Sequence, residues 1–373
     1  MRIVHLPLNT GGNPHQLSAA EHALGPSSEC WVFEDNFSRL APEDLIFHPK
    51  SGILNRELKK WRLFFRALRT KDVFHYNFGQ KFFPLFVRPF KKNETLSERC
   101  KRLLWWIYAA LFGRLDLWLP RLMGKKIYMT WQGDDCRQGD YCREHYTIHF
   151  VNEVPDGYYD KYSDERKRRA IRLYEHYCDG IFAINPDLMN VLPKGTHFLP
   201  YSHVDLEKWK PVSTKNSRPQ IVHAPSHRDV KGTRFLVEAI DRLKKRGYDF
   251  DFVLVEGLPN SDAKRIYEQA DILVDQLLAG WYGGVALELM ALGKPVVCYI
   301  RHEDARHIPE SMLNELPLIE ANPETIESVL ADLLDHRDRW PDIGQRSRAF
   351  VEKWHDPARV ASDVIKVYHD KRS

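Results

Sequence analysis

Two adjacent glycines, Gly283 and Gly284, directly precede a short apolar segment that carries one carboxylate, Glu288. Glycine lacks a Cβ atom, so it costs backbone entropy but lets a ligand approach the main chain closely. The first turn of a helix exposes unpaired N–H groups and a partial positive charge, which favour an anion. The pattern therefore indicates one of two structures. It is either a phosphate site, with Glu288 one turn inside to accept ribose hydroxyls, or a tight strand-to-helix turn with an ion-paired glutamate.

A second cationic feature lies earlier in the same half of the chain. The segment IVHAPSHRDVKGTRFLVEAI places a strand and a polar loop before Lys231 and Gly232, which precede another helix. Lys231 supplies a point charge for a phosphate, and Arg228 or Ser226 is available from the loop. A solvated lysine before a helix is common on its own. Together with the glycine turn at 283–284, it favours a diphosphate site.

The elements that would position these residues alternate along the whole chain. Apolar strand patterns alternate with helical ones such as Thr233–Arg246, which has apolar residues at 235, 236, 239, 240 and 243. Such alternation predicts an α/β protein with parallel sheets. The expected strands are Met1–Leu6, Cys30–Glu34, Val73–Tyr76, Lys126–Thr130, Gly180–Ile184, Gln220–Ala224, Phe250–Val255, Ile272–Gln276 and Pro295–Ile300.

A chain of 373 residues exceeds one ordinary core, which predicts two domains. The polar, proline-bounded segment Leu199–Pro219 has little periodicity and indicates the boundary. We expect two Rossmann-like, doubly wound parallel-sheet domains that face each other across a cleft, where ligands sit at the carboxyl ends of the strands. The expected bounds are 1–200 for the first domain, 201–216 for the linker, 217–355 for the second domain, and 356–373 for a C-terminal helix that packs back on the first domain.

The composition, 43% hydrophobic and 28% charged, is typical of a soluble globular protein. Its six cysteines are scattered without a CxxC pair, which argues against a disulfide framework or a zinc site and favours a reducing compartment. The N-terminus MRIVHLPLNTGG is a strand running into a glycine turn, without the pattern of a signal peptide. These features predict a cytoplasmic protein.

Several segments resemble landmarks of the GT-B glycosyltransferases, specifically family 4. They are TWQGDDCR, CDGIFAINPDLM, HVDLEKWKP, APSHRDVKGT, GWYGGVALELMALGKPVV and KWHDPARVA, in that family's order along most of the chain. The C-terminal half is the specific part of the match. The resemblance implies a nucleotide diphosphate sugar, UDP- or GDP-linked, held mainly by the second domain, and an acceptor held mainly by the first. It also implies transfer without a metal or other cofactor, usually with retention at the anomeric carbon.

The resemblance also assigns roles to residues of the second domain. Lys231 would bind the donor phosphates and Glu288 the ribose. The diphosphate would lie along the amides of Gly283, Gly284 and Val285, and Glu256 and Gly257 would hold the base.

The chain departs from the family pattern at three positions. Gly280 stands where family members often carry a glutamate eight residues before the ribose-binding one, and Ser226 replaces a common arginine, for which Arg228 is the nearest substitute. In the first domain, Gln132 replaces a histidine that usually faces the reacting sugar. A neutral group there still orients the sugar or supports developing charge.

An inverting mechanism would instead need a carboxylate base, for which Asp134 and Asp135 are the candidates. The alternative is that both are turn residues that cap the next helix.

Acceptor contacts are expected from two loops of the first domain. In NTGGNPHQL, Gly11 and Gly12 form a second pair of glycines before an expected helix, and Asn13 and His15 follow them. In the resembled fold this loop overhangs the cleft. His75 and Asn77 end the strand Val73–Tyr76 and are further candidates, although a lone histidine at a strand end is more often structural.

The segment from Lys59 to Lys126 is strongly basic and rich in aromatic residues. It holds 17 Lys and Arg against 4 Asp and Glu, leaving 38 of the 55 basic and 47 of the 51 acidic residues elsewhere. Its longest apolar run, Leu103–Gly113, has 11 residues, against the ~20 that span a bilayer. Two interpretations remain: the segment lies on an anionic leaflet, as suits a polyprenyl-diphosphate-linked acceptor, or Leu103–Leu111 is a buried helix with solvated flanks. No nucleic-acid-binding module accompanies the basic residues.

Three functional hypotheses follow. The first is a glycosyltransferase, peripheral at the inner face of the membrane, that acts on a glycan or lipid-linked acceptor in bacterial surface-polysaccharide assembly. The second is a nucleotide-sugar epimerase of the same fold, for which Gly280 and Gln132 leave room. The third is a catalytically weak binding subunit of a transferase complex.

Overall fold

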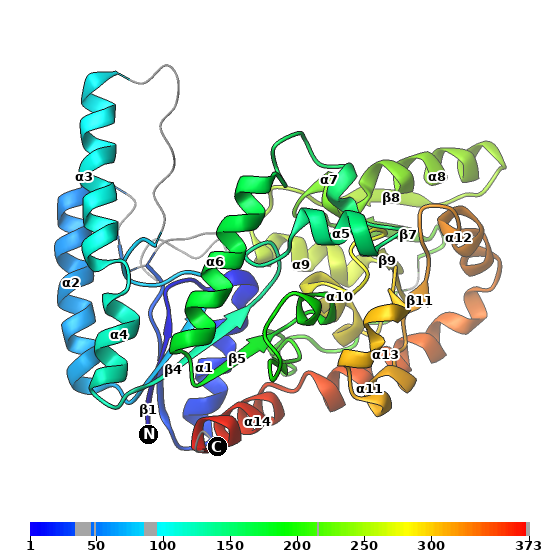
Figure 1. The fold of residues 1–373 in the computed structure, drawn as a ribbon. Helices are drawn as coiled ribbons and strands as arrows, with labels where there is room; N and C mark the ends of the chain where they lie inside the picture. Colours follow the sequence, from blue (N-terminus) through cyan, green and yellow to red (C-terminus); the bar gives the residue numbers. More distant parts are fainter. Residues whose placement is uncertain (34–45, 48–49, 86–94, 215, 371–373) are drawn as a thin grey trace.

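The computed structural model describes residues 1–33, 46–47, 50–85, 95–214 and 216–370 (Figure 1). Parts of four expectations lie outside the described residues: residue 34 of the strand expected at Cys30–Glu34, residues 86–94 of the basic segment, residue 215 of the linker, and residues 371–373 of the C-terminal helix. The described chain forms two α/β halves, each built on one parallel sheet, as predicted.

The first sheet has six parallel strands in the order β2-β1-β3-β4-β5-β6. The strands are β1 (Arg2–Leu6), β2 (Ser27–Cys30), β3 (Val73–Asn77), β4 (Lys126–Trp131), β5 (Gly180–Ala183) and β6 (His197–Phe198). Its helices are α1 (Asn13–Ala23), α2 (Ile53–Thr70), α3 (Leu96–Phe112), α4 (Leu115–Leu122), α5 (Gly139–His145) and α6 (Lys161–Tyr177), with short 3₁₀ turns at Thr10–Gly12, Phe150–Asn152 and Pro186–Asn190.

The second sheet has five parallel strands in the order β11-β10-β9-β7-β8. They are β7 (Gln220–His223), β8 (Asp251–Leu254), β9 (Ile272–Val274), β10 (Val296–Cys298) and β11 (Ile319–Glu320). The helices are α7 (Arg228–Lys231), α8 (Thr233–Lys245), α9 (Asn260–Gln269), α10 (Gly284–Ala291), α11 (Glu310–Asn314), α12 (Ile326–Asp335), α13 (Trp340–Trp354) and α14 (Pro357–His369), with 3₁₀ turns at His302–His307 and Arg337–Arg339.

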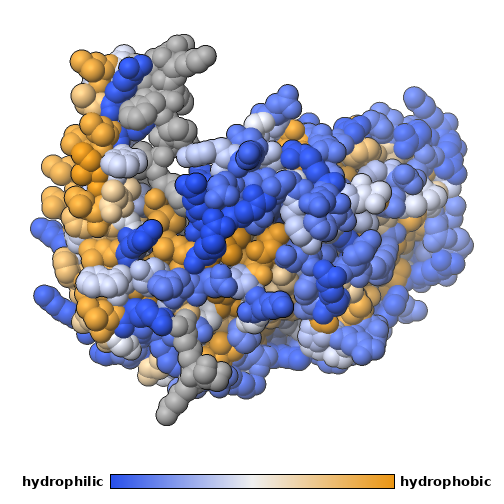
Figure 2. Space-filling view, viewed as in Figure 1, coloured by the Kyte–Doolittle hydropathy of each residue, from blue (hydrophilic) through white to orange (hydrophobic). Residues whose placement is uncertain are grey.

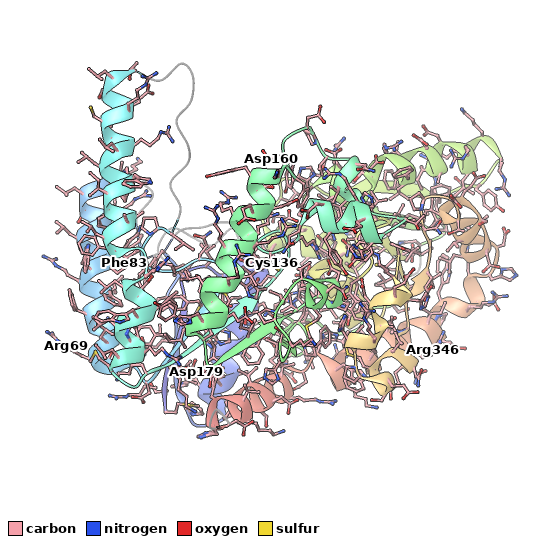
Figure 3. The ribbon with its side chains drawn as sticks, viewed as in Figure 1. Arg69, Phe83, Cys136, Asp160, Asp179 and Arg346 are labelled. Carbon is pink, nitrogen blue, oxygen red and sulfur yellow. The ribbon has the colours of Figure 1, made fainter. Side chains whose placement is uncertain are left out.

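Local sequence explains most of these elements. In α8, apolar residues three and four apart (Leu236, Ala239, Ile240, Leu243) form one buried stripe, which packs the helix on the second sheet. Asp160 begins α6 as an N-cap whose carboxylate accepts the Ser163 amide at 2.6 Å (Figure 3). β3 is buried along its whole length, as a central parallel strand requires.

The strand expected at Cys30–Glu34 begins earlier than predicted. β2 is the polar segment Ser27–Cys30, which pairs with β1 from Arg2 to His5. Beyond β2, the Trp31 and Phe33 amides donate to the His5 and Pro7 carbonyls. Tertiary pairing overrides the apolar pattern here. β6 and β11 have two residues each and are too short to give a pattern.

The chain crosses between the two halves twice, and the crossings touch. Beyond β6, the Ser202 amide bonds the Asn13 side chain at 2.6 Å at the start of α1. After α13, His355 contacts the Tyr201 carbonyl at 2.8 Å and the Tyr282 hydroxyl at 2.9 Å. Beyond this junction α14 lies against α1 and the first sheet, where the Tyr368 hydroxyl bonds His75 (Figure 1).

A second contact between the halves lies away from the crossings. Apolar side chains from 142–159 pack against Leu278 and Ala279. Around this cluster the Arg301 guanidinium donates to the Ile148 carbonyl at 2.8 Å, and Arg234 pairs with Glu153 at 2.7 Å. Both crossings and this contact join the two halves.

Helices α2, α3 and α4 stand together at the outer edge of the first half, and α3 extends beyond the other two (Figure 1). Trp61 of α2 meets Phe112 of α3 edge-on at 5.0 Å, and the Tyr108 hydroxyl donates to Glu57 at 2.9 Å. No residue of α3 is buried. The alternative that Leu103–Leu111 is a buried helix is therefore wrong.

Candidate functional site

The cationic and glycine features of the second half meet at one point of its sheet. β7 lies between β8 and β9, so the strand order reverses between β7 and β9. Lys231 follows β7, and Gly283 follows β9. In open α/β sheets, ligands bind at the carboxyl ends of the strands beside such a switch point. The topology thus brings together the two features that sequence predicted for a diphosphate.

Asp275, immediately after β9, joins them. Its carboxylate accepts the Lys231 ammonium at 2.8 Å and the Gly283 amide at 2.6 Å, and it is almost fully buried. The expectation of bare amides at the start of α10 is therefore wrong for Gly283, whose N–H group is engaged. A carboxylate occupies the anion position, while Gly284 and Val285 are half-buried.

Glu288 lies one turn into α10 in a nearly closed environment. It is 7% exposed, and its Oε1 atom accepts the Asn260 side-chain amide at 3.1 Å. Burial raises the pKa of Glu288 to about 7, against a smaller opposing effect of the Asn260 hydrogen bond. Near neutral pH the carboxyl group exchanges between its neutral and charged forms, so it is able to accept hydroxyl donors when charged.

His203, from the crossing after β6, lies between the glycine turns of the two halves. A Cβ atom on Gly284 would lie 3.2 Å from His203 Nε2, and one on Gly12 would lie 3.7 Å from His203 Cβ. Burial lowers the pKa of His203 to about 4, so the imidazole is neutral at pH 7 and its 4.0 Å approach to Glu288 is no ion pair there. The buried Nδ1 atom has no partner among the described residues.

Arg228 and Glu256, assigned to the donor phosphates and the base, bind each other. Two parallel hydrogen bonds join them, with Arg228 Nε 2.8 Å from Glu256 Oε1. Ser226 and Gly257 are exposed beside this pair. All four lie at the carboxyl ends of β7 and β8, so a ligand there meets a neutralised pair rather than an isolated cation.

Gly280 has a steric requirement that explains its departure from the family pattern. Its φ is +83°, and a Cβ atom would lie 2.6 Å from the Arg301 guanidinium. Arg301 is buried, donates to the Leu278 and Ala279 carbonyls, and pairs with Asp304 at 3.3 Å. The volume next to position 280 is thus filled by an arginine that also contacts the other half of the chain.

In the first half, Gln132 and Asn77 come together where β3 and β4 end. The Gln132 side-chain amide donates to Asn77 Oδ1 at 3.3 Å, and its buried Oε1 atom has no partner among the described residues. Asp135 accepts the Gln132 and Gly133 amides at 3.1 and 2.7 Å. Burial raises the pKa of Asp135 to about 6. These bonds are those of a turn-capping aspartate.

Asp134 takes a different set of partners. Tyr158 donates to it at 2.8 Å, and the Tyr159 hydroxyl also bonds to it. Both aspartates thus have structural partners, while their oxygens remain next to a cavity described below.

The remaining acceptor candidates lie in different environments, some buried and some exposed. His75 is completely buried within β3, where it bonds Tyr368 and the Thr130 hydroxyl, the latter at 2.6 Å, so it has no path to an acceptor and is structural. Asn13 is buried and holds Ser202. His15 and Gly11 are exposed on the loop after β1, and Gly12 faces His203.

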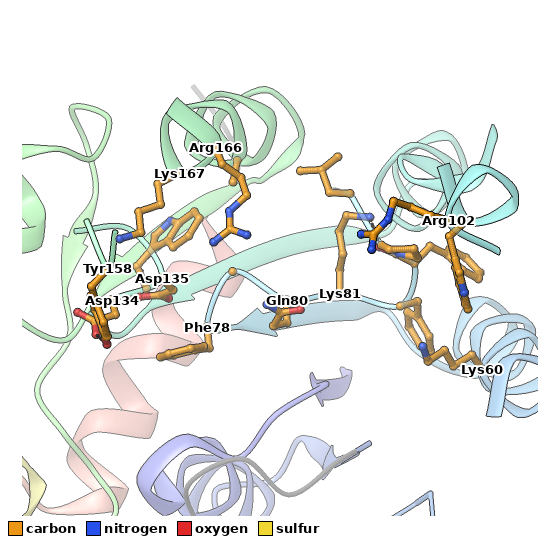
Figure 4. A pocket seen from close by; sticks show the side chains of 18 of the residues that line it. Lys60, Phe78, Gln80, Lys81, Arg102, Asp134, Asp135, Tyr158, Arg166 and Lys167 are labelled. Atoms are coloured by element: carbon orange, nitrogen blue, oxygen red, sulfur yellow. Dashed lines mark hydrogen bonds between the residues drawn. The ribbon is translucent and has the colours of Figure 1, made fainter. Parts of the chain in front are cut away.

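A cavity of about 1210 Å³ extends from Asp134 and Asp135 to α3 (Figure 4). At the end of β3 it is lined by Phe78, which has the unusual φ of +57°, and by Gly79, whose Cβ position would lie 3.0 Å from the Trp131 ring. A non-glycine residue in this conformation is found preferentially at functional sites. Further lining side chains are Lys60, Gln80, Lys81, Phe82, Phe83, Glu98, Lys101, Arg102, Trp105, Tyr158, Arg166 and Lys167.

Several of these residues were not predicted from the sequence. Asp275 was inside an expected strand, and a carboxylate at the end of a parallel strand was an available signal. His203 and Tyr158 lie in segments without periodicity, so only the folded chain brings them to the site. Arg301 is 21 residues from Gly280 and gave no local signal.

Comparison with known proteins gives a likeness of fold. Neither a protein-family model nor a curated protein sequence matches the chain. Three solved structures align over nearly all of it. HepE from Anabaena, in complex with UDP-glucose, has a TM-score of 0.60 at 11% identity, with 99% of each chain covered. Sucrose-phosphate synthase from Thermosynechococcus elongatus has 0.58 at 12%, covering 99% of this chain and 98% of that one.

The catalytic domain of starch synthase IV from Arabidopsis thaliana, bound to ADP and acarbose, has a TM-score of 0.57 at 11% identity, with 98% of each chain covered. At these identities the likeness concerns the fold. With its two facing parallel-sheet halves, the chain has the GT-B fold.

Proposed function

We propose that the protein is a glycosyltransferase that uses a nucleotide diphosphate sugar. The observation that carries this proposal is the convergence of Lys231, Gly283 and Glu288 at the switch point of the second sheet. The HepE structure with UDP-glucose and the starch synthase structure with ADP, both similar in fold, support a nucleotide-linked donor.

The donor diphosphate would take the place of the Asp275 carboxylate at Lys231 and at the start of α10. Lys231 exchanges one anionic partner for another, so its charge stays compensated when the donor leaves. Glu288 would accept the ribose hydroxyls in its charged form. Glu256 and Gly257 would contact the base, with Arg228 and Ser226 beside them.

We further propose transfer with retention of anomeric configuration and without a metal. The aspartates that an inverting mechanism would use, Asp134 and Asp135, are held by tyrosines and by backbone amides. Gln132 offers an unpartnered oxygen near Asn77, and we assign it to the reacting sugar. The leaving phosphate would take the acceptor proton.

The acceptor is a glycan or a lipid-linked glycan, and the outer helices bind an anionic membrane surface. Leu104, Trp106 and Leu111 of α3 are each more than 60% exposed. Figure 2 shows hydrophobic side chains gathered over the outer helices of the first half. Other large exposed apolar side chains are Ile53, Leu54, Leu58 and Phe65 of α2 and Trp118, Leu122 and Met123 at α4. Exposed basic residues on the same helices include Lys59, Arg62, Arg66, Arg69, Arg99 and Arg121. Apolar area flanked by cations matches an anionic leaflet.

Among the described residues, none of the helices is both long enough and apolar enough to cross a bilayer. Contact would therefore be along the surface, at the inner face of the membrane. This placement suits a polyprenyl-diphosphate-linked acceptor in surface-polysaccharide assembly.

Slow donor hydrolysis by the purified full chain tests the first proposal. A thermal-shift screen with UDP- and GDP-sugars first selects the donor, since a ligand that binds the native state raises Tm. Released sugar of retained configuration is the expected product. An isomerised donor would indicate an epimerase instead, and binding without turnover would indicate a binding subunit.

Vesicle co-sedimentation tests the second proposal. Binding to anionic vesicles should exceed binding to zwitterionic ones and fall with salt. Leu104→Asp with Leu111→Asp should abolish it, whereas Val237→Asp, at an exposed apolar position of the other half, should not. Equal binding by the two aspartate variants would contradict a specific membrane face.

A further inference from the structure

Helix α3 presents two chemically different stripes. Glu98, Lys101, Arg102 and Trp105 follow the i, i+3, i+4, i+7 spacing of one helix face and line the 1210 Å³ cavity. Leu103, Leu104, Ile107 and Leu111 follow a second face with the same kind of spacing and are exposed. An ordinary surface helix turns its apolar stripe inward. Here the polar and aromatic stripe faces the inner cavity and the apolar stripe faces outward.

Charged side chains of both signs line the cavity. Asp134 and Asp135 lie at the end next to β4, and Lys60 and Arg102 lie at the end formed by α2 and α3 (Figure 4). Arg166 reaches in from α6. The carboxylates suit hydroxyl groups, and the cationic end suits an anion.

Most cations of the cavity already have internal partners. Lys81 pairs with Asp116 at 2.8 Å, Lys60 pairs with Glu57 at 2.8 Å, and Lys167 donates to the Arg137 carbonyl at 2.6 Å. Lys101 and Arg166 differ, because within the described ranges neither forms an ion pair. They stand on helices α3 and α6, which face each other across the cavity.

We infer that this cavity binds the phosphate group of an amphiphilic acceptor, with Lys101 and Arg166 as its cationic contacts. The hydroxyl-bearing head group of the ligand extends to Asp135 and Gln132, and its apolar chain leaves along the outer stripe of α3. The inference rests on the proposed function and adds the residues that hold the phosphate of the acceptor.

The dimensions of the cavity agree with such a ligand. Small-molecule sites commonly measure ~300–1,000 Å³, so 1210 Å³ has room for a sugar together with one or two phosphates. Trp105 and Phe82 give the cavity apolar walls between the charged groups.

Farnesyl diphosphate is a suitable probe, because it is a short amphiphile with the proposed anionic group. Its binding to the full chain is measured by calorimetry in the presence of saturating UDP, which keeps the diphosphate out of the donor site. The double variant Lys101→Gln, Arg166→Gln should bind it at least about tenfold more weakly, as expected for two lost charge-assisted contacts. The matched control is Arg99→Gln, Arg169→Gln, which changes two exposed cations on the same two helices outside the cavity.

Three results would overturn the inference. Equal losses of farnesyl diphosphate affinity in the two double variants would show that the effect comes from net charge alone. Farnesol binding as tightly as farnesyl diphosphate would exclude a phosphate site. Inorganic pyrophosphate binding as tightly would exclude an amphiphile. UDP affinity, measured in the same variants, separates this inference from the proposed function: it should be unchanged by Lys101→Gln, Arg166→Gln even where probe binding is lost.

Discussion

The carboxylate of Asp275 lies 2.8 Å from the ammonium group of Lys231, and the same carboxylate accepts the first amide of the glycine turn at 2.6 Å. Both residues are largely buried. The site that sequence predicts for an anionic ligand therefore contains an anion of the protein's own chain. This pair determines how variants of the site should behave.

Lys231→Ala should lower both stability and nucleotide affinity. It leaves the buried Asp275 carboxylate without its cation, which costs about 3–5 kcal/mol when one partner of a buried pair is removed. The double variant Lys231→Gln, Asp275→Asn removes both charges and should recover most of that stability while nucleotide binding stays weak. Chemical denaturation and UDP titration of the three proteins measure the two effects. Full UDP affinity in the double variant would show that Lys231 is not a donor contact.

Glu288 should make stability depend on pH. The buried carboxyl has a pKa of about 7, against an ordinary value of 4.5, so the folded chain keeps a proton that the unfolded chain has released between those pH values. The free energy of unfolding should therefore fall as pH rises from about 4.5 to 7, by at most about 3 kcal/mol, and level off above. Denaturation of wild type and Glu288→Gln at several pH values isolates the effect, because glutamine does not titrate.

The same titration should appear in ligand binding. Ribose hydroxyls donate to the charged carboxylate, so the rise in UDP affinity from pH 6 to pH 8 should be larger in the wild type than in Glu288→Gln, where only the phosphate of UDP titrates. A glutamine variant with the wild-type pH profile would place the ribose elsewhere.

Gly280 should resist substitution more than another glycine with positive φ. Gly257 has φ +71° with nothing near its Cβ position, so Gly257→Ala should cost about 1–2 kcal/mol from backbone strain alone. Gly280→Ala adds a contact of 2.6 Å with Arg301 and should cost about 1–3 kcal/mol more. A double-mutant cycle with Arg301→Ala measures the coupling. Additive effects in that cycle would mean that the guanidinium is not the obstacle.

Asp135→Asn should reduce the stability of the fold more than the rate of donor hydrolysis. The side chain accepts two backbone amides, and loss of its charge should cost about 1–2 kcal/mol. Donor hydrolysis should stay within about tenfold of wild type, since retaining transfer needs no carboxylate base at this position. A fall of about a thousandfold in a folded variant would identify Asp135 as a general base and contradict retention.

The sequence predicted the parts of the fold that depend on local patterns. The central strands and α8 lie close to their expected bounds because burial on one stripe or on both faces leaves a periodic signal. β2 begins three residues before its expected range because a polar segment pairs with β1, and polar segments carry no such signal.

At the candidate site, the sequence pointed to positions but could not give their partners. The strand order of the second sheet brings together Lys231, Gly283 and Glu288. Their partners lie elsewhere in the chain: Asp275 is 44 residues from Lys231, and Asn260 is 28 residues from Glu288. The imidazole of His203 reaches the start of α10 from the segment between the two halves. Arg228 and Glu256 were assigned separate contacts, whereas they neutralise each other, because a pair 28 residues apart becomes visible only after folding.

His355 lies in the second segment through which the chain passes between the halves, contacts the first at the Tyr201 carbonyl, and also bonds Tyr282, next to the glycine turn. Because the two crossings are joined at one point, that point would act as a hinge between the halves. A connection of this kind would favour rotation about an axis near His355 over twisting or sliding. Any opening that admits a donor would then displace the start of α10 least and separate the Arg301–Ile148 contact most. The residues around the donor's phosphates would therefore keep their positions while the halves move apart at Arg301.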